Sequence, residues 1–92
     1  MKFKSLEPVA VGTEAVALSL DTPACRVMLQ ADPGDPDGAG ANEATVYFGS
    51  RDGQPHKLNP GDSTMFEITN LNEVLVSGTD GDHLLVSYWV RN

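Results

Sequence analysis

The chain has a single cysteine, Cys25, among its 92 residues. A lone cysteine excludes an internal disulfide, which is the usual covalent support of very small domains. The length fits one domain, and a domain of this size buries only about 60–65% of the surface that its unfolded chain exposes. We therefore expect a thin core that gains stability from a partner. Cys25 lies in an alternating apolar run and is expected to behave as a small buried hydrophobic residue.

Basic residues are scarce, and long apolar runs are absent. Six lysines and arginines stand against 13 aspartates and glutamates, so the net charge is −7. This balance argues against nucleic acid and anionic membranes as partners, because binding to phosphate groups needs clustered basic side chains. No stretch approaches the roughly 18 apolar residues that span a bilayer. The start, M-K-F-K-S-L-E-P, lacks the apolar run of a secretion signal. We expect a soluble protein, compatible with a reducing cytoplasm.

Motifs for catalysis and metal binding are also missing. The two histidines, His56 and His83, have no nearby histidine or cysteine at zinc-ligand spacing and are expected on the surface. The loop that begins at Asp32 is acidic, but an EF-hand register fails there, because Gly34 occupies the third position and Asp37 the sixth. A solvated loop is the favoured interpretation. No nucleophile elbow or phosphate-binding loop occurs. We predict no enzyme activity, no catalytic residue, no metal site and no cofactor.

The chain does contain apolar residues that alternate with polar ones, which is the period of a β-strand. Residues 58–90 include three such runs, with bends at 60–62, 70–72 and 79–82. Proline and glycine favour the first bend, asparagine in the left-handed region the second, and Asp-Gly the third. We predict three consecutive antiparallel strands, a meander that ends at the C-terminus.

Further strands are expected upstream of this region. Residues 25–31 and 44–49 alternate clearly, and residues 14–20 place apolar side chains at period two. Residues 57–58 form a short strand after a turn region at 50–56. Residues 2–6 form either an edge strand or an arm that orders on a partner. Residues 32–43 form a long exposed loop.

These runs predict an all-β fold, a single small antiparallel β-sandwich or jelly-roll-like barrel of seven to eight short strands. Residues 1–11 are the N-terminal arm or edge strand, and residues 12–92 are the β-sandwich domain. The alternation assigns a set of large apolar side chains to the core. They are Val27, Leu29, Val46, Phe48, Phe66, Ile68, Val86 and Tyr88.

Large apolar side chains also fall on the predicted outer faces of the strands. Met28, Tyr47, Met65 and Trp89 alternate away from the core, and the last strand adds Leu85 on the same side as Trp89. Two interpretations stay open. Either both faces are partly buried, or a strand register is shifted by one residue, which would exchange its two faces. Alternatively, these side chains form an oligomer or partner interface, where aromatic residues and methionine are enriched.

Four stretches follow one another in a distinctive order: V-Y-F-G-S (46–50), L-N-P-G-D-S (58–63), E-I-T-N-L-N-E-V-L-V-S-G-T-D-G-D (67–82) and L-L-V-S-Y (84–88). They resemble a pattern in small β-sandwich virion proteins of tailed bacteriophages. There, a V-Y-V-G strand precedes L-x-P-G-E-S, a strand ending near I-Y-V-S-G and an apolar C-terminal strand. Over roughly half its length, the chain is similar to head decoration (cement) proteins and related head or tail accessory proteins.

The resemblance implies a non-enzymatic structural virion protein, a capsid decoration subunit that is assembled in the host cytoplasm. It implies the major capsid protein or another virion protein as partner, and a threefold lattice position implies a homo-oligomer, a trimer. The candidate interface residues are Lys2, Phe3, Lys4, Tyr47, Met65, Leu85 and Trp89. The alternative is a carbohydrate-binding β-module of a phage tail or adhesin, for which Tyr47, Tyr88 and Trp89 are the available aromatic side chains.

Overall fold

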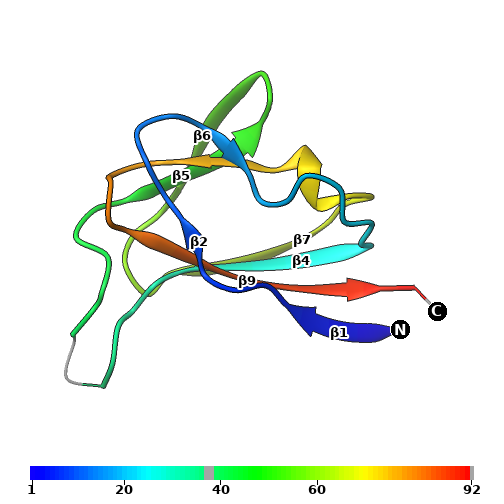
Figure 1. Cartoon of the computed structure of the whole chain (residues 1–92), viewed down its shortest axis with the longest axis horizontal. Coiled ribbons are helices and arrows are strands. Elements are labelled where there is room, and N and C mark those ends of the chain that lie inside the picture. The colour runs from blue at the N-terminus through cyan, green and yellow to red at the C-terminus, as the bar shows by residue number, and fades with distance from the viewer. Residues whose placement is uncertain (37–38, 92) are drawn as a thin grey trace.

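The computed structural model of the chain describes residues 1–36 and 39–91. Within these residues the regular structure is β-strand apart from one short 3₁₀ helix (Figure 1). The strands are β1 (Lys2–Ser5), β2 (Val9–Ala10), β3 (Val16–Ala17), β4 (Arg26–Ala31), β5 (Val46–Ser50), β6 (Gly53–Leu58), β7 (Ser63–Glu67), β8 (Leu75–Ser77) and β9 (His83–Val90). The 3₁₀ helix η1 (Leu71–Glu73) lies between β7 and β8.

The strands form two antiparallel sheets that pack together as a β-sandwich, which confirms the predicted fold class. Sheet A has the order β1-β9-β4-β7, and sheet B has the order β3-β8-β5-β6. Strand β2 pairs with the start of β9, and β1 pairs with its end. Because β4 occupies the other side of β9, β1 and β2 share one strand position. The N-terminal segment is thus an edge strand in this structure.

The strand pairs are nested within one another along the chain. The first strand pairs with the last, β1 with β9, and the next pairs inward are β3 with β8, β4 with β7 and β5 with β6. Successive pairs alternate between sheet A and sheet B. The chain therefore corresponds to one long hairpin that has been rolled up, with the β5–β6 turn as its closed end.

The predicted meander is wrong, because β7 and β9 belong to sheet A and β8 belongs to sheet B. The turns themselves exist: Gly61 (φ 88°) and Gly81 (φ 93°) adopt the left-handed conformation that glycine tolerates. Each turn leads the chain from one sheet to the other. The bend at 70–72 forms differently from the prediction. Asn70 is extended (φ −156°), and its side chain accepts hydrogen bonds from the backbone N–H groups of Asn72 and Thr22, both at 3.0 Å.

Two strand boundaries also differ from the predictions. Of residues 14–20 only β3 is strand, and Leu20 is 95% exposed while Leu18 is buried. The local pattern was apolar, but Asp21 and Pro23 follow closely, and only a two-residue stretch pairs with β8. Residues 50–56 are largely strand β6 and not a turn region. Strand β6 contains Pro55 and is an edge strand, where a missing N–H is tolerated.

The core lies between the sheets and is formed mainly by β4, β9, β5 and β8. Its buried apolar side chains are Val11, Leu18, Ala24, Val27, Leu29, Ala31, Val46, Leu58, Leu71, Val74, Val76, Leu84, Val86 and Tyr88. Five predicted core residues are among them. The other three, Phe48, Phe66 and Ile68, are only partly buried and pack against this cluster, so their prediction as fully buried residues is wrong.

One end of the core is closed by two buried polar side chains. Asn42 donates to the backbone oxygen of His83 (2.8 Å) and accepts from its N–H (2.7 Å). The carboxylate of Asp82 accepts from the N–H groups of Glu43 (2.9 Å) and Ala44 (3.1 Å). These bonds tie the end of the long loop to the start of β9. Burial of these polar groups is tolerated because the hydrogen bonds that they lose to water are replaced by bonds within the protein.

Candidate interaction surface

The outer face of sheet A, the side away from sheet B, is the first candidate surface. The alternation in β4 and β9 places buried side chains inward, so the intervening residues point outward. Residues directly opposite each other in adjacent strands share a face. Pairing therefore brings onto one surface side chains from all four main strands of the sheet. They are Phe3, Ser5, Arg26, Met28, Gln30, Ser63, Met65, Glu67, Leu85, Ser87 and Trp89.

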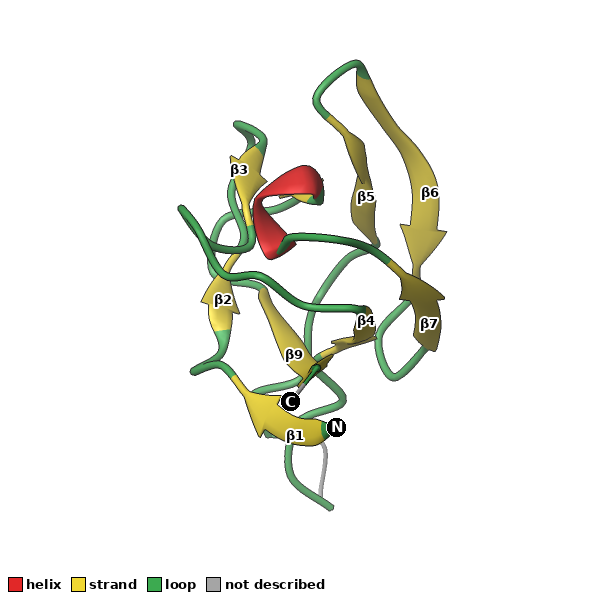
Figure 2. Cartoon of the chain, turned by 90° about the vertical axis from the view of Figure 1, so that its right-hand side faces the viewer, coloured by secondary structure: helices red, strands yellow, loops and turns green. Residues whose placement is uncertain are grey.

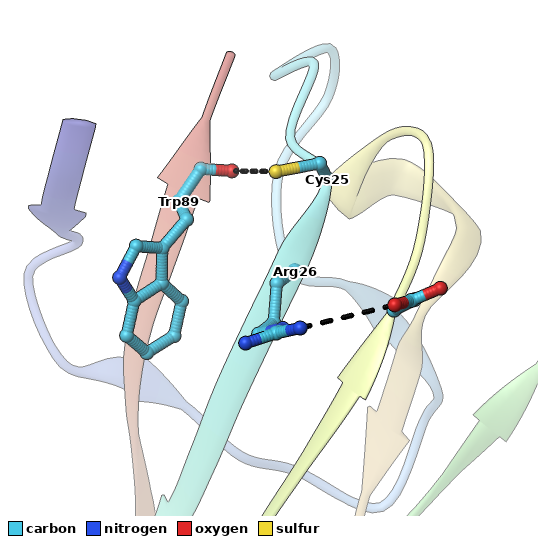
Figure 3. A network of polar contacts seen from close by, with 4 residues as sticks. Cys25, Arg26 and Trp89 are labelled. Carbon is cyan, nitrogen blue, oxygen red and sulfur yellow. Dashed lines mark hydrogen bonds and ion pairs between the residues drawn. The ribbon is translucent and has the colours of Figure 1, made fainter. Parts of the chain in front are cut away.

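A row of four side chains crosses this face near the C-terminus. Phe3 contacts Trp89 with ring centroids 4.8 Å apart and planes tilted by 58°. Arg26 lies between Trp89 and Glu67 in the pairing, and its guanidinium is 3.8 Å from the Glu67 carboxylate (Figure 3). The Cys25 thiol donates to the backbone oxygen of Trp89 at 3.3 Å. Cys25 is thus half-buried and hydrogen-bonded, not the fully buried residue that its pattern predicted.

The neighbouring rows contain both apolar and polar side chains. Met28 of β4 lies between Met65 of β7 and Ser87 of β9, and Ser87 shares a 3.0 Å hydroxyl contact with Ser5 of β1. The next row contains Leu85. Met28 and Leu85 are half-buried, whereas Met65 is 51% exposed. The outer face of a sheet exposed to water is normally polar, so this grouping of large apolar side chains makes the face a candidate interaction surface.

The structure gathers four of the seven candidate interface residues on this face: Phe3, Met65, Leu85 and Trp89. It does not place the others there. Tyr47 pairs with Ser77 and Lys57 on the outer face of sheet B, on the opposite side of the sandwich. Lys2 and Lys4 lie opposite Val90 and Tyr88, so both lysines point to the side of β1 that faces sheet B, and both are exposed.

A groove between the edge strands β6 and β7 is a second candidate, which the sequence did not indicate. It has a volume of about 730 Å³ and opens to solvent. Its floor contains stacked Phe48 and Phe66, with centroids 5.8 Å apart and planes at 7°, and His56 lies 5.2 Å from Phe48. The only signal in the sequence was the phenylalanines themselves. Their alternation predicted burial, and nothing local showed that the two sheets part at this side.

Three carboxylates, Asp52, Glu67 and Glu73, border the groove, and the residues that line it include no lysine or arginine. The Thr69 hydroxyl donates to Glu73 and lowers the pKa of that carboxyl from its usual value of 4.5. The Thr69 N–H also donates to Glu73, at 3.0 Å. Glu73 therefore stays ionised at neutral pH, and the groove combines aromatic faces with negative charge.

The remaining candidate residues do not form a site in the structure. Among the described residues, no group of three or more histidine, cysteine, aspartate or glutamate side chains is arranged to hold a metal ion. In the acidic loop Asp32 accepts from the Gly34 N–H at 2.9 Å, a local turn contact, and Asp37 lies outside the described residues. His56 lines the groove, whereas His83 begins β9 and is not among the lining residues. No helix in the described part of the chain is long and apolar enough to cross a membrane.

Comparisons with known proteins add no relative to this picture. No protein-family model, curated protein or solved structure matches the chain.

Proposed function

We propose that the chain is a non-enzymatic structural virion protein, a decoration subunit that binds between capsid subunits of a phage shell as a homo-oligomer, a trimer. Its activity would be binding alone. Contacts made only with the assembled shell stabilise that shell by mass action, because they are absent when the shell subunits separate.

The apolar outer face of sheet A is the observation that carries the proposal. Phe3, Trp89, Met28, Met65 and Leu85 come from four strands and lie next to one another on it. Methionine and aromatic residues are enriched at the centre of protein–protein interfaces. A surface that carries these five large apolar side chains, with Arg26 and Glu67 beside them, is better suited to contact with a partner protein than to contact with water.

The nested strand order supports the same proposal by analogy of fold. Pairing of first with last strand, in two sheets of four strand positions, supports the expectation of a jelly-roll-like fold, and jelly rolls recur in viral capsid and lectin domains. A fold hosts many functions, so this analogy adds to the surface argument and does not replace it.

The alternative, a carbohydrate-binding module, lacks the aromatic platform that it was expected to use. Tyr88 is buried in the core, Trp89 lies on the outer face of sheet A, and Tyr47 lies on the outer face of sheet B. These three rings therefore cannot line a single sugar-binding groove.

Cosedimentation with tailed-phage capsids stripped of their own decoration protein tests the proposal. Leu85→Asp places a charge at the centre of the outer face of sheet A, and we expect it to weaken capsid binding by more than about tenfold. Tyr47→Ala removes an exposed side chain from the opposite face and should bind like the parent. Circular dichroism checks that both variants fold. Capsid binding by Leu85→Asp equal to that of the parent would overturn the proposed surface. Binding to a glycan array without capsid binding would replace the function with the alternative.

A further inference from the structure

The four edges of the two sheets are protected to different degrees. Natural sheets discourage pairing at an edge by very short strands, lysine, proline or bulges. Strand β3 has two residues, β6 contains Pro55 and a register shift in its pairing with β5, and β1 carries Lys2 and Lys4. Strand β7, with the sequence S-T-M-F-E, has no such feature in its interior. It is the edge that is open to another strand.

Along the free edge of β7, the edge away from β4, backbone groups are directed at solvent. Ala31 of β4 donates to Asp62 (3.0 Å) and accepts from Gly61 (2.9 Å), so its backbone groups point toward β7. In an antiparallel ladder this direction alternates along the strand. Thr64 and Phe66 consequently bond with β4, while the N–H and C=O groups of Ser63, Met65 and Glu67 face the free side.

Side chains around this edge define what a docking strand should carry. The side of β7 that faces sheet B opens into the groove, where Phe66 and Phe48 present aromatic faces and Asp52 and Glu73 present carboxylates. On the outer face of sheet A, β7 presents Met65. A complementary strand has basic side chains on one face, for contact with the carboxylates and the aromatic rings, and an apolar side chain on the other.

Strand β1 has this pattern. Lys2 and Lys4 point toward the side of sheet B, and Phe3 points to the outer face of sheet A. Because Leu6 donates to Val86 at 3.0 Å, alternation directs the backbone groups of Phe3 and Ser5 to the free side of β1. Figure 2 shows β1 and β7 at opposite edges of sheet A, so neither strand blocks the other.

We propose that copies of this chain associate head to tail, with β1 of one copy pairing at the free edge of β7 of the next. Pairing continues sheet A from copy to copy. It places Lys2 and Lys4 in the acidic aromatic groove and Phe3 beside Met65. Two β1 strands would oppose lysine to lysine, which disfavours a symmetric contact through that edge. Head-to-tail contacts form a closed ring when the rotation between successive copies adds up to a full turn. A ring of three copies would be the trimer of the proposed function.

The inference rests on the homo-oligomer part of the proposed function. Different results would overturn the edge pairing and the capsid-binding role. Capsid binding depends on the outer face of sheet A and is tested by Leu85→Asp. Association of copies depends on the two edges. A monomer that still binds capsids through Leu85 would overturn the edge pairing and the homo-oligomer part of the proposed function, but not capsid binding. An oligomer that binds no capsid would overturn only the decoration role.

Complementary edge blocking tests the proposal with the full chain. Met65→Pro removes a free-side N–H from β7, and Ser5→Pro does the same on β1, without loss of a backbone bond to β4 or β9. Ser5→Pro also removes the hydroxyl contact with Ser87. By analytical ultracentrifugation, the parent should be oligomeric. Each variant alone should be monomeric, with association weakened by more than about tenfold. An equal mixture should form one species, a dimer, because each variant retains the edge that the other lacks. Tyr47→Ala is the matched control and should remain oligomeric.

The identity of the inserted strand is tested by charge. Joint Lys2→Glu and Lys4→Glu substitution should abolish association, because the groove is acidic. Circular dichroism and thermal melting establish that each variant is folded. If a proline variant does not fold, Met65→Lys or Ser5→Lys is used in its place to block the same edge. A monomeric parent, a blocked variant that still associates, or a mixture that stays monomeric would each overturn the proposal. Association that survives the lysine reversal would show that β1 is not the inserted strand, which also overturns it.

Discussion

The two sides of the core differ in how completely they are closed. At the end held by Asn42 and Asp82, Leu84 is fully buried, and no buried side-chain nitrogen or oxygen of the described residues lacks a hydrogen-bond partner. At the side between β6 and β7, Phe48 and Phe66 are only partly buried and line an open groove. Alternating apolar residues thus produce a fully buried core where loops and the hydrogen-bonded side chains of Asn42 and Asp82 cover the sheets. The same alternation leaves an open groove where two edge strands face each other.

The largest effect is expected at the closed end. Leu84→Ala should lower the free energy of unfolding by about 2–5 kcal/mol, because a fully buried leucine leaves a cavity that the packed sheets cannot fill. This is a large part of the stability of a small domain. Chemical denaturation followed by fluorescence of Trp89 measures it. A loss below about 1 kcal/mol would show that this end is not tightly packed.

A smaller effect is expected on the open side. A fully buried phenylalanine would cost about 3–5 kcal/mol when replaced by alanine. For Phe66→Ala we expect about 1–2 kcal/mol, because the ring is already partly in water and its loss enlarges an open groove without creating a cavity. The same denaturation experiment tests the comparison. A loss equal to that of Leu84→Ala would mean that the groove is closed in solution.

The smallest effect concerns Glu73 at the rim of the groove. The Thr69 hydroxyl lowers the pKa of Glu73 in the folded state. The stability that ionised Glu73 contributes is therefore present at pH values above its unfolded-state pKa, and it is lost as the pH falls through its folded-state pKa. The melting temperature of the parent should therefore exceed that of Glu73→Gln at neutral pH, and the gap should close below pH 4.5. Thr69→Val is the matched control, since it removes the hydroxyl and should reduce the same gap. A gap independent of pH would contradict this origin.

Much of the fold could be predicted because strand faces follow from local alternation. In β4 and β9 the alternation places Val27, Leu29 and Val86 inward, as the structure has them. The choice of strand partner could not be predicted in this way. The Asp-Gly bend at 80–81 is a local hairpin signal, but β8 and β9 pair with strands far away in the sequence. The predicted turn region at 50–56 is largely strand β6, and this strand tolerates Pro55 because it lies at the edge of sheet B.

For the candidate surfaces, too, local sequence predicted the direction of side chains but not which strands are neighbours. The sequence by itself determined that Met65, Leu85 and Trp89 point away from the core, because a side chain's direction depends on its own strand. Tyr47 has the same local pattern, and only the assignment of β5 to sheet B separates it from them. The tertiary structure also decided that Phe48 and Phe66 meet beside an unprotected edge. Adjacency between strands depends on long-range pairing, and the free energy of that pairing is shared among residues that no local pattern connects.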